Sequence, residues 1–465
     1  MRVCRSIAAA ILCVSILLVC SCRTLEPHRE GVLTGYLPEP IRVDAVEVVP
    51  QTQWWLTFES AQLNRLMEEA FFGSLTLEQA AARLQQAEAL ARKAGATGKI
   101  QLEGKAAASS RYTSSQTGSH TDPTLSLGLY ASYELDLWGR LQSQEKAALA
   151  DWEASKFDLQ TVAMSLSAEL ANNYFAWLAQ NETLAIYTSQ LESNRNKLTA
   201  MELRYRTGLS TSLDLLRQRQ QVAAATAKLP PVRALINASE NKIAVLIGKV
   251  PGTDFGLTPK PLPLLPVQPV TGLPVGLLEN RPDIQAARLA LESADWDVGA
   301  ARAAQLPSIS LTGNMTTGDD ELEDLFDDWA SNLAANLLAP LLDGGSRKAE
   351  VDRALAVSRE KIAAYRLTLL EAIRETQDAF SNEKHQTDYV EAIGRQYNAA
   401  QKSESESMRR YQRGILPYLD TLTAIVARES LEITYIQAQA ALLANRIQLY
   451  RSLGGDWTFI LESQR

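Results

Sequence analysis

Cysteine is almost absent from this chain, whose only four cysteines are Cys4, Cys13, Cys20 and Cys22. Beyond residue 22 there is consequently no thiol for a disulfide, a metal site or a nucleophile. Histidine is nearly as scarce, with three scattered residues, and no phosphate-loop, GxSxG or HExxH pattern occurs. These absences predict a protein that is not an enzyme and that needs no cofactor or metal.

Long apolar runs and an excess of positive charge are also missing. After the first 22 residues, no run reaches the roughly eighteen apolar residues that indicate a transmembrane helix. The formal charge of −8 argues against a nucleic-acid partner, which requires a clustered basic face. With 46% hydrophobic and 22% charged residues, the composition is that of a folded chain.

The N-terminus has the pattern of an export signal. Arg2 and Arg5 precede an uncharged, mostly apolar run over residues 6–20. The following Val19-Cys20-Ser21-Cys22 resembles a bacterial lipoprotein box. We expect residues 1–21 to be a lipoprotein signal peptide and Cys22 to be acylated, which would anchor the chain in a membrane. A cleaved signal without lipidation is the alternative.

A seven-residue apolar period organises the middle of the chain. From Leu170 an apolar residue returns every seven positions, at Trp177, Leu184, Leu191, Leu198 and Tyr205. This period is typical of helices that supercoil against partners. Gly208 can end that helix in the left-handed conformation, and Ser210, Thr211 or Ser212 can cap the next one. The pattern predicts two long helices joined by a tight tip.

The tip motif occurs twice. The segment Arg204-Tyr205-Arg206-Thr207-Gly208 is echoed by Arg410-Tyr411-Gln412-Arg413-Gly414, and Asp214 is echoed by Asp420 at the same offset. Self-similarity at one offset indicates an internal duplication.

Two segments in each half have a period of two instead. The clearest alternation places seven residues on one face: Leu125, Leu127, Leu129, Ala131, Tyr133, Leu135 and Leu137. Weaker alternation covers residues 100–109, 308–315 and 332–341, and we expect a polar turn from Ser114 to Pro123. Apolar-out, polar-in alternation is typical of membrane strands around a wet lumen. A half-buried hairpin in a soluble sheet is the alternative.

Between the two strands of the second half lies an acidic segment. Residues 319–328 contain seven acids in ten positions but lack the Asp-x-Asp-x-Asp-Gly spacing of a calcium loop. We expect a solvated external loop.

Each half therefore reads as helix, two strands, long helix, tip and returning helix. The long helices have about 65 residues, or roughly 100 Å, and Pro230-Pro231 must kink or interrupt the first returning helix. We expect an extended lead at 22–53, a first repeat at 54–249, a proline-rich linker at 250–274, a second repeat at 275–457 and a tail at 458–465. Four strands cannot close a barrel by themselves, so we expect an oligomer.

The ordered motifs resemble the TolC/OprM family of outer-membrane efflux channels, in its lipoprotein branch. They are the two tips and the segments Trp54–Phe58, Tyr133–Arg140, Arg281–Ile284, Gly299–Ile309 and Asp343–Gly345. The resemblance implies a mainly α chain with a small membrane β part. It also implies a homotrimer with a 12-stranded β-barrel continued by a 12-helix periplasmic α-barrel.

This resemblance also implies a function in the bacterial outer membrane. The channel would conduct drugs or other small molecules from an inner-membrane pump of the RND type and a periplasmic adaptor to the outside. The outlet of a type I protein secretion system is one alternative. A periplasmic coiled-coil spacer lipoprotein, which needs no alternating strands, is an alternative of another class.

The family pattern further assigns residue roles at the tips. Asp214 and Asp420 would ring the narrow periplasmic end as a gate, although compensation of a helix dipole also explains them. Tyr411 matches a position that tethers the closed tip, but Leu416 replaces its polar partner. The adaptor would contact Gly208, Gly414, Arg204, Arg206, Arg410 and Arg413, whereas a simple helix end explains the glycines without a partner.

Overall fold

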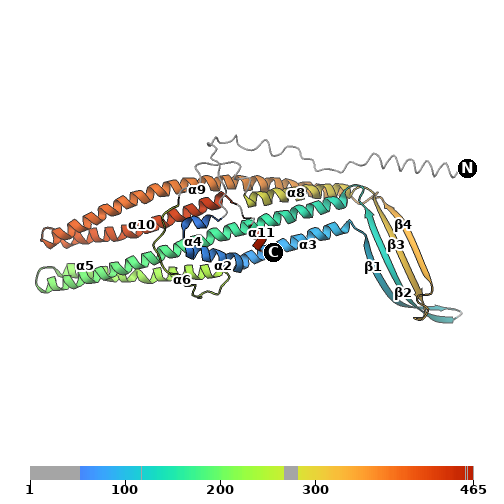
Figure 1. The fold of residues 1–465 in the computed structure, drawn as a ribbon, viewed down its shortest axis with the longest axis horizontal. Coiled ribbons are helices and arrows are strands. Elements are labelled where there is room, and N and C mark those ends of the chain that lie inside the picture. The colour runs from blue at the N-terminus through green and yellow to red at the C-terminus, as the bar shows by residue number, and fades with distance from the viewer. Residues whose placement is uncertain (1–52, 117, 267–280, 456, 458, 464–465) are drawn as a thin grey trace, which may run out of the picture. The chain divides into compact units, whose positions relative to one another are not determined.

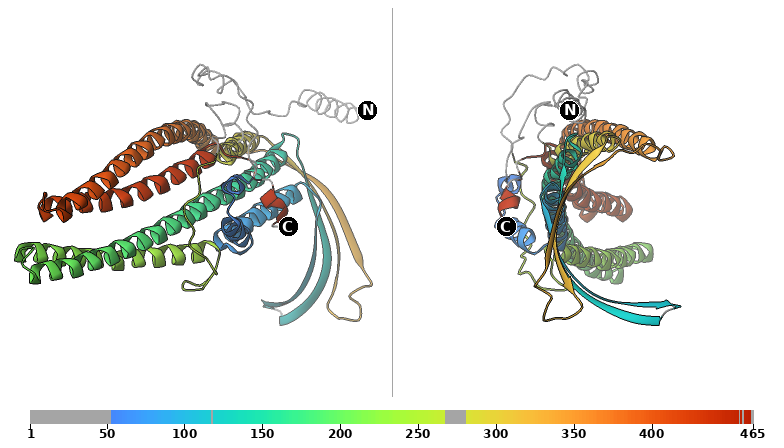
Figure 2. Two further views of the ribbon diagram at one scale, coloured as in Figure 1. Left: turned by 60° about the vertical axis from the view of Figure 1, so that its left-hand side comes forward. Right: turned by 90° about the vertical axis from the view of Figure 1, so that its right-hand side faces the viewer.

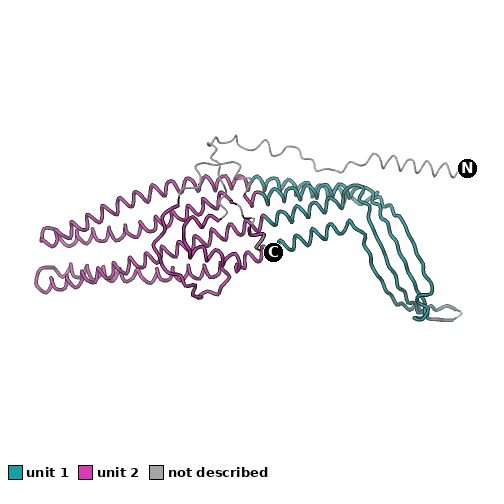
Figure 3. The backbone as a smooth tube through the Cα atoms, in the orientation of Figure 1, with its two compact units in different colours: residues 1–38, 83–156, 285–367 teal, residues 39–82, 157–284, 368–465 magenta. Residues whose placement is uncertain are grey.

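The computed structural model describes residues 53–116, 118–266, 281–455, 457 and 459–463 (Figure 1). The expected signal peptide, Cys22 and residues 267–274 of the expected linker lie outside this part. The chain divides into two compact units (Figure 3). The described part of the first unit comprises Arg83–Lys156 and Gln285–Leu367. That of the second lies in Glu39–Ala82, Phe157–Ile284 and Thr368–Arg465.

The first unit contains one antiparallel sheet with the order β1-β2-β3-β4. Its strands are β1 (Gln101–Ser115), β2 (Gly118–Leu135), β3 (Ser308–Asp319) and β4 (Trp329–Leu338). Figure 2 shows them side by side in a curved sheet. The central pairing joins the two halves of the sequence, with Leu135 opposite Ile309 and Leu129 opposite Met315. Strands β1 and β4 form the two edges.

The predicted division of the sheet into an apolar and a polar face is confirmed by the register. Leu129 lies opposite Gly104 on one side and Met315 on the other, which continues one apolar row across three strands. Three residues further along β2, and therefore on the opposite face, Ser132 lies opposite Gln101 and Thr312. Because partners across an antiparallel ladder point to the same face, apolar and polar rows alternate through the middle of β1, β2 and β3. The alternation is broken by Thr317, which lies opposite Leu127, and by Ser331 on β4, which lies opposite Met315.

The polar turn expected at Ser114 to Pro123 is wrong in extent. Strands β1 and β2 continue through most of it, with Tyr112 opposite Thr121 and Ser110 opposite Pro123. Tyrosine and threonine favour strands even where a segment is polar. Pro123 is tolerated because the pairing of β2 with β3 begins only at Leu125, so the other edge of β2 is free there.

Four helices contribute to the first unit: α3 (Leu75–Thr97), α4 (Arg140–Arg206), α8 (Pro282–Ala303) and α9 (Ser346–Gln412). The predicted long helices are confirmed, since α4 and α9 each have 67 residues. Helix α8 packs on α9 through small apolar residues, with Val298 and Ala301 against Ala354.

The second unit contains the two hairpins that end in the predicted tips. One joins α4 to α5 (Ser212–Ala227) and α6 (Leu229–Leu246), and the other joins α9 to α10 (Tyr418–Ser452). The predicted interruption of the first returning helix is confirmed, because α5 ends and α6 begins on either side of Lys228. No helix in the described residues is long and apolar enough to cross a membrane.

Aromatic side chains form the core of the second unit around its terminal segments. These come from η1 (Trp54–Phe58), α2 (Ala61–Gly73), α4, α10 and α11 (Phe459–Ser463). The ring of Trp54 stacks on that of Tyr450 at 5.3 Å, and Phe58 lies 4.9 Å from Phe175. The first residues of the proline-rich segment run alongside α2. There, Gln62 Nε2 donates a hydrogen bond to the hydroxyl of Thr258 at 2.6 Å.

The seven-residue seam of α4 is buried over only part of its length. Leu170, Trp177 and Leu191 are at most 6% exposed, whereas Tyr205 at the tip is 45% exposed. Within one chain the seam residues are therefore buried far from the tip and become exposed near the tip.

Candidate gate at the helical tips

The two tips have the same backbone geometry. Gly208 and Gly414 both have φ of +74°, which only glycine adopts without strain. In the first tip, Leu209 N donates to Arg204 O at 2.7 Å, and in the second Ile415 N donates to Arg410 O at 2.9 Å. Each helix thus ends in a Schellman-type closure. This closure accounts for both glycines by local geometry.

Asp214 lies in the first turn of α5, where it forms a capping box with Thr211. Its Oδ2 accepts a hydrogen bond from the Thr211 hydroxyl at 2.7 Å, and its backbone N–H donates to that hydroxyl at 3.2 Å. A weak ion pair with Arg217, at 3.5 Å, adds to this. Asp214 therefore stabilises the start of α5 in addition to any role in a gate.

Asp420 occupies the matching turn of α10 but has different surroundings. Pro417 precedes the helix and offers no side-chain cap. The Asp420 side chain is exposed and has no hydrogen bond or ion pair to the residues the structure describes. Its charge therefore faces solvent in a single chain.

Tyr411 lies between the two hairpins at the end of α9. The guanidinium of Arg204 lies 4.8 Å from the centre of its ring, and its hydroxyl contacts Met201 Sδ at 3.8 Å. Burial raises the pKa of Tyr411, the charge of Arg204 opposes that shift and Asp214 adds to it. The tyrosine thus bridges the hairpins through a cation–π contact and a weak sulfur contact.

The remaining predicted arginines divide into paired and exposed ones. Arg410 binds the carboxylate of Glu406 at 2.8 Å, and so does its neighbour Arg409, which was not among the predicted residues, at 2.7 Å. These bonds lower the pKa of Glu406, and the bond from Arg410 contributes most to the shift. Arg206 and Arg413 lie exposed at the two turns.

A closer link between the hairpins was missed by the sequence analysis. Tyr418 on α10 donates a hydrogen bond to Oε1 of Gln218 on α5, and both side chains are buried. The ring of Tyr418 also packs against Met201 and Leu215 in a small apolar cluster. One signal was available, because the first copy of the repeat has Ser212 where the second has Tyr418.

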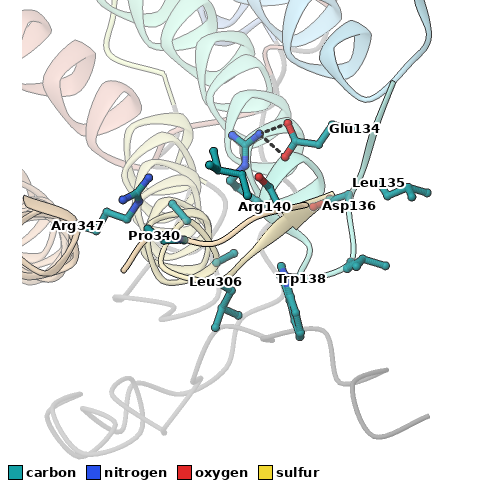
Figure 4. A pocket seen from close by; sticks show the side chains of 13 residues that line it. Glu134, Leu135, Asp136, Trp138, Arg140, Leu306, Pro340 and Arg347 are labelled. Atoms are coloured by element: carbon teal, nitrogen blue, oxygen red, sulfur yellow. Dashed lines mark hydrogen bonds and ion pairs between the residues drawn. The ribbon is translucent and has the colours of Figure 1, made fainter. Parts of the chain in front are cut away.

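A pocket of about 250 Å³ lies in the first unit, where strands meet helices (Figure 4). Its arginines already have acidic partners. The Nη2 of Arg140 donates to both carboxylate oxygens of Glu134 at 2.7 Å, and Arg347 Nη1 lies 3.4 Å from Asp343 Oδ2. Trp138 ties the junction to β3 by donating to Pro307 O at 2.6 Å. These contacts brace the junction. The described residues contain no cluster of His, Cys, Asp and Glu suited to a metal ion.

Comparison with known proteins shows which family has this architecture. The profile described as "Outer membrane efflux protein" matches residues 66–249 and 273–455. Pyoverdine export outer membrane protein OpmQ of Pseudomonas aeruginosa is 32% identical over 436 residues, which cover 90% of this chain and 89% of the relative. Cation efflux system protein CusC of Escherichia coli is 28% identical over 418 residues, covering 89% and 90%.

Solved structures agree with these sequence matches. The outer-membrane channel OprN superposes with a TM-score of 0.83 at 28% identity, covering 90% of this chain and 99% of that one. The outer membrane protein VceC from Vibrio cholerae gives a TM-score of 0.81 at 27% identity, covering 88% and 100%. The chain therefore belongs to the outer membrane efflux protein family, and it is the outer-membrane channel of a tripartite efflux system, not an enzyme.

Proposed function

We propose that three copies of this chain form one pore, with a 12-stranded β-barrel continued by a 12-helix tunnel in the periplasm. The open edges of the sheet carry this proposal. In the described sheet, β1 pairs only with β2 and β4 pairs only with β3, so each of them has one unpaired edge in the single chain. A membrane tolerates no unpaired strand edge, so β4 of one copy must pair with β1 of the next.

The polarity of the strands and the size of the barrel support the number three. An even number of antiparallel strands lets β4 and the next copy's β1 pair antiparallel. Two copies would give an eight-stranded barrel, and side chains fill the interior of a barrel of that size. Three copies leave a lumen lined by the polar rows of the sheet.

The cargo we propose is a small molecule that an inner-membrane pump of the RND type delivers through a periplasmic adaptor. The relatives named above export pyoverdine and cations, which supports small molecules over a secreted protein. A periplasmic coiled-coil spacer would not need four alternating strands, so the strands favour the channel over the spacer.

The tips are the surface we propose for the adaptor. Leu209 and Ile415, which follow the two tip glycines, are 66% and 67% exposed. Gly208, Gly414, Arg204, Arg206, Arg410 and Arg413 surround them. Large apolar side chains exposed at matching places in both repeats favour a partner there.

We further propose that Asp214, Asp420 and Tyr411 form the periplasmic gate, in which three chains bring six carboxylates together. Such a ring narrows the tunnel and favours cations. For the chain as a whole we propose the division expected from the sequence: a lead at 22–53, a first repeat at 54–249, a linker at 250–274, a second repeat at 275–457 and a tail at 458–465.

Lipidation of Cys22 completes the proposal, because several acyl chains suffice for stable anchoring in the outer membrane. Replacing Cys22 with Ala should abolish palmitate labelling of the protein in cells. Labelling that persists in the Cys22→Ala variant would contradict the anchor.

Single-channel recording tests the function itself. The purified mature protein in a planar bilayer should give discrete conductance steps that heat denaturation removes. Absence of current both in the assembled parent protein and in its Asp214→Ala, Asp420→Ala double variant would contradict the proposed channel.

A further inference from the structure

A buried carboxylate links three helices of the two hairpins, some distance above the tips. Glu429 on α10 is 1% exposed. Its Oε1 accepts a hydrogen bond from Asn194 Nδ2 on α4 at 2.9 Å, and its Oε2 accepts one from Gln221 Nε2 on α5 at 3.1 Å. Both donors are neutral amides, so the carboxylate is satisfied by hydrogen bonds in a site that water does not reach.

These bonds close into a circuit that begins and ends on α10. Asn194, which binds Glu429 through its side chain, also accepts a hydrogen bond at its backbone carbonyl oxygen from Gln218 Nε2 at 2.7 Å. The Oε1 of Gln218 accepts the hydroxyl of Tyr418. Tyr418 and Glu429 are eleven residues apart, which is about three helical turns and the same helix face. We call Glu429, Asn194, Gln218 and Tyr418 the Glu429 circuit.

A second layer of polar contacts surrounds the circuit and adds helix α9. Gln190 on α4 donates to the carbonyl oxygen of Glu429 at 3.2 Å and to Glu432 Oε2 at 2.9 Å. Arg428 joins Glu432 on α10 to Glu404 on α9, at 2.6 and 2.7 Å. Helices α4, α5, α9 and α10 therefore share one hydrogen-bonded network.

Directional bonds of this kind fix the axial register of the hairpins. One residue of helical slip moves a side chain by about 1.5 Å, which is more than a hydrogen bond tolerates. Apolar contacts are non-directional and would allow graded slip. Each member of the circuit is buried, so breaking one hydrogen bond leaves its donor or acceptor without a partner and without water. Because that loss is costly, we expect the bonds of the circuit to break together.

The polarity of this interface also suits separation. When two hairpins part, an apolar surface pays a hydrophobic penalty in water, whereas amide and carboxylate groups become hydrated. Buried polar groups are best attested as devices that set register or act as switches. A polar layer beside the apolar cluster of Met201, Leu215 and Tyr418 is thus an interface that can both lock and release.

We propose that the Glu429 circuit is the register lock that holds the α9–α10 hairpin on the α4–α5 hairpin, and that its release is a required step of channel opening. The second clause rests on the proposed channel function. Glu429 acts as a positioning residue, because it would set where the tip residues lie without touching the cargo.

Distances between spin labels test the lock directly. Leu209→Cys and Ile415→Cys place labels on exposed residues of the two tips, and protein without these cysteines gives the background. Labelled copies are diluted with unlabelled ones, so that each assembly carries at most one labelled copy. The parent protein should give one short distance. Glu429→Ala should raise the population with the tips apart about tenfold, which corresponds to about 1.4 kcal/mol.

Matched variants separate the lock from a general loss of charge or fold. Glu406→Ala removes an exposed carboxylate that binds only arginines of its own helix, and it should leave the distance unchanged. Glu429→Gln keeps an acceptor for Asn194 but turns a donor towards Gln221, so it should give an intermediate result. Tyr418→Phe breaks the other end of the circuit and keeps its packing. These two variants carry the test if Glu429→Ala does not fold.

Conductance supplies the second readout. Glu429→Ala should raise the basal conductance above that of Glu406→Ala. The proposal is overturned if the two variants agree in label distance, or if both pass current and have the same basal conductance. Failure of the channel function is recognised separately, because then neither the parent protein nor any variant passes current, while the label distances still report the lock.

Discussion

Tyr418 and Gln218 form a buried hydrogen bond between α10 and α5, although the two residues are 200 positions apart in the sequence. Burial raises the pKa of Tyr418, and Tyr411 and the charge of Asp214 raise it further. The phenol is thus held protonated where it joins the two hairpins. This contact links the tips to the Glu429 circuit.

The raised pKa of Tyr418 predicts a loss of stability at alkaline pH. In the unfolded chain a tyrosine loses its proton near pH 10, whereas folded Tyr418 retains it to a higher pH. The stability is therefore fully present below about pH 10 and falls as pH rises towards the folded value. Tyr418→Phe should flatten this fall in the melting temperature, and it should lower stability by about 1 kcal/mol at pH 8 through the lost bond.

Tyr205→Phe, on an exposed tyrosine of the first tip, is the control and should follow the parent curve. An alkaline fall of equal slope in Tyr418→Phe and in the parent protein would show that this phenol is not the group responsible.

Neutralising the two tip aspartates should raise basal conductance. We expect this of Asp214→Ala combined with Asp420→Ala, because the proposed gate depends on their charges. Asp214→Asn combined with Asp420→Asn is the sharper variant, since the amide oxygen at position 214 would still accept from Thr211 and preserve the helix cap. Asp378→Asn, on an exposed ion pair with Arg374, serves as the control. Single-channel records of a closed channel unchanged by either double variant would remove the gate assignment.

Gly248 should be the least replaceable glycine after α6. Its φ is +74°, and an added Cβ would lie 1.9 Å from the carbonyl oxygen of Gly73 on α2. Gly252 also has a positive φ, +87°, but nothing within 4 Å. Gly248→Ala should therefore destabilise the protein by on the order of 3 kcal/mol and Gly252→Ala by about 1–2 kcal/mol. Equal melting temperatures for the two variants would contradict the close approach of α2.

A buried ion pair between α9 and α10 should be sensitive to loss of either partner. Arg446 is 1% exposed, and its Nε and Nη2 bind Glu383 at 2.8 and 2.7 Å. Burial alone would lower the pKa of Arg446, but Glu383 outweighs it and the pKa is raised. Glu383→Gln leaves a buried charge without its counter-ion and should cost about 3–5 kcal/mol.

Glu391→Gln removes a carboxylate whose pairing with Arg395, at 3.7 Å, is solvent-exposed. This control should change stability by less than about 0.5 kcal/mol. The prediction fails if thermal unfolding finds both variants equally mild.

Much of the architecture follows from periodicity. The seven-residue repeat and the glycine at each tip predict α4, α9 and their ends within a few residues, because local capping decides where a helix stops. Two-residue alternation predicts the rows of the sheet. It missed the continuation of β1 and β2 across Tyr112 and Thr121, where the turn signal of polar residues outweighed strand propensity.

The residues that join the hairpins were beyond such reasoning. Asn194, Gln218 and Glu429 are polar, and polar residues on a long helix predict a solvated face. Their burial depends on partners from other helices, up to 235 positions away. Tyr411 was assigned by resemblance and does lie between the hairpins, but the stronger contact belongs to Tyr418.

The mass of the intact assembly tests the central claim most directly, since the sheet edges require copies of this chain to share one pore. Native mass spectrometry of the detergent-extracted protein should give three times the mass of the mature, acylated chain. A single chain at all concentrations, with β1 and β4 left unpaired, would contradict the account.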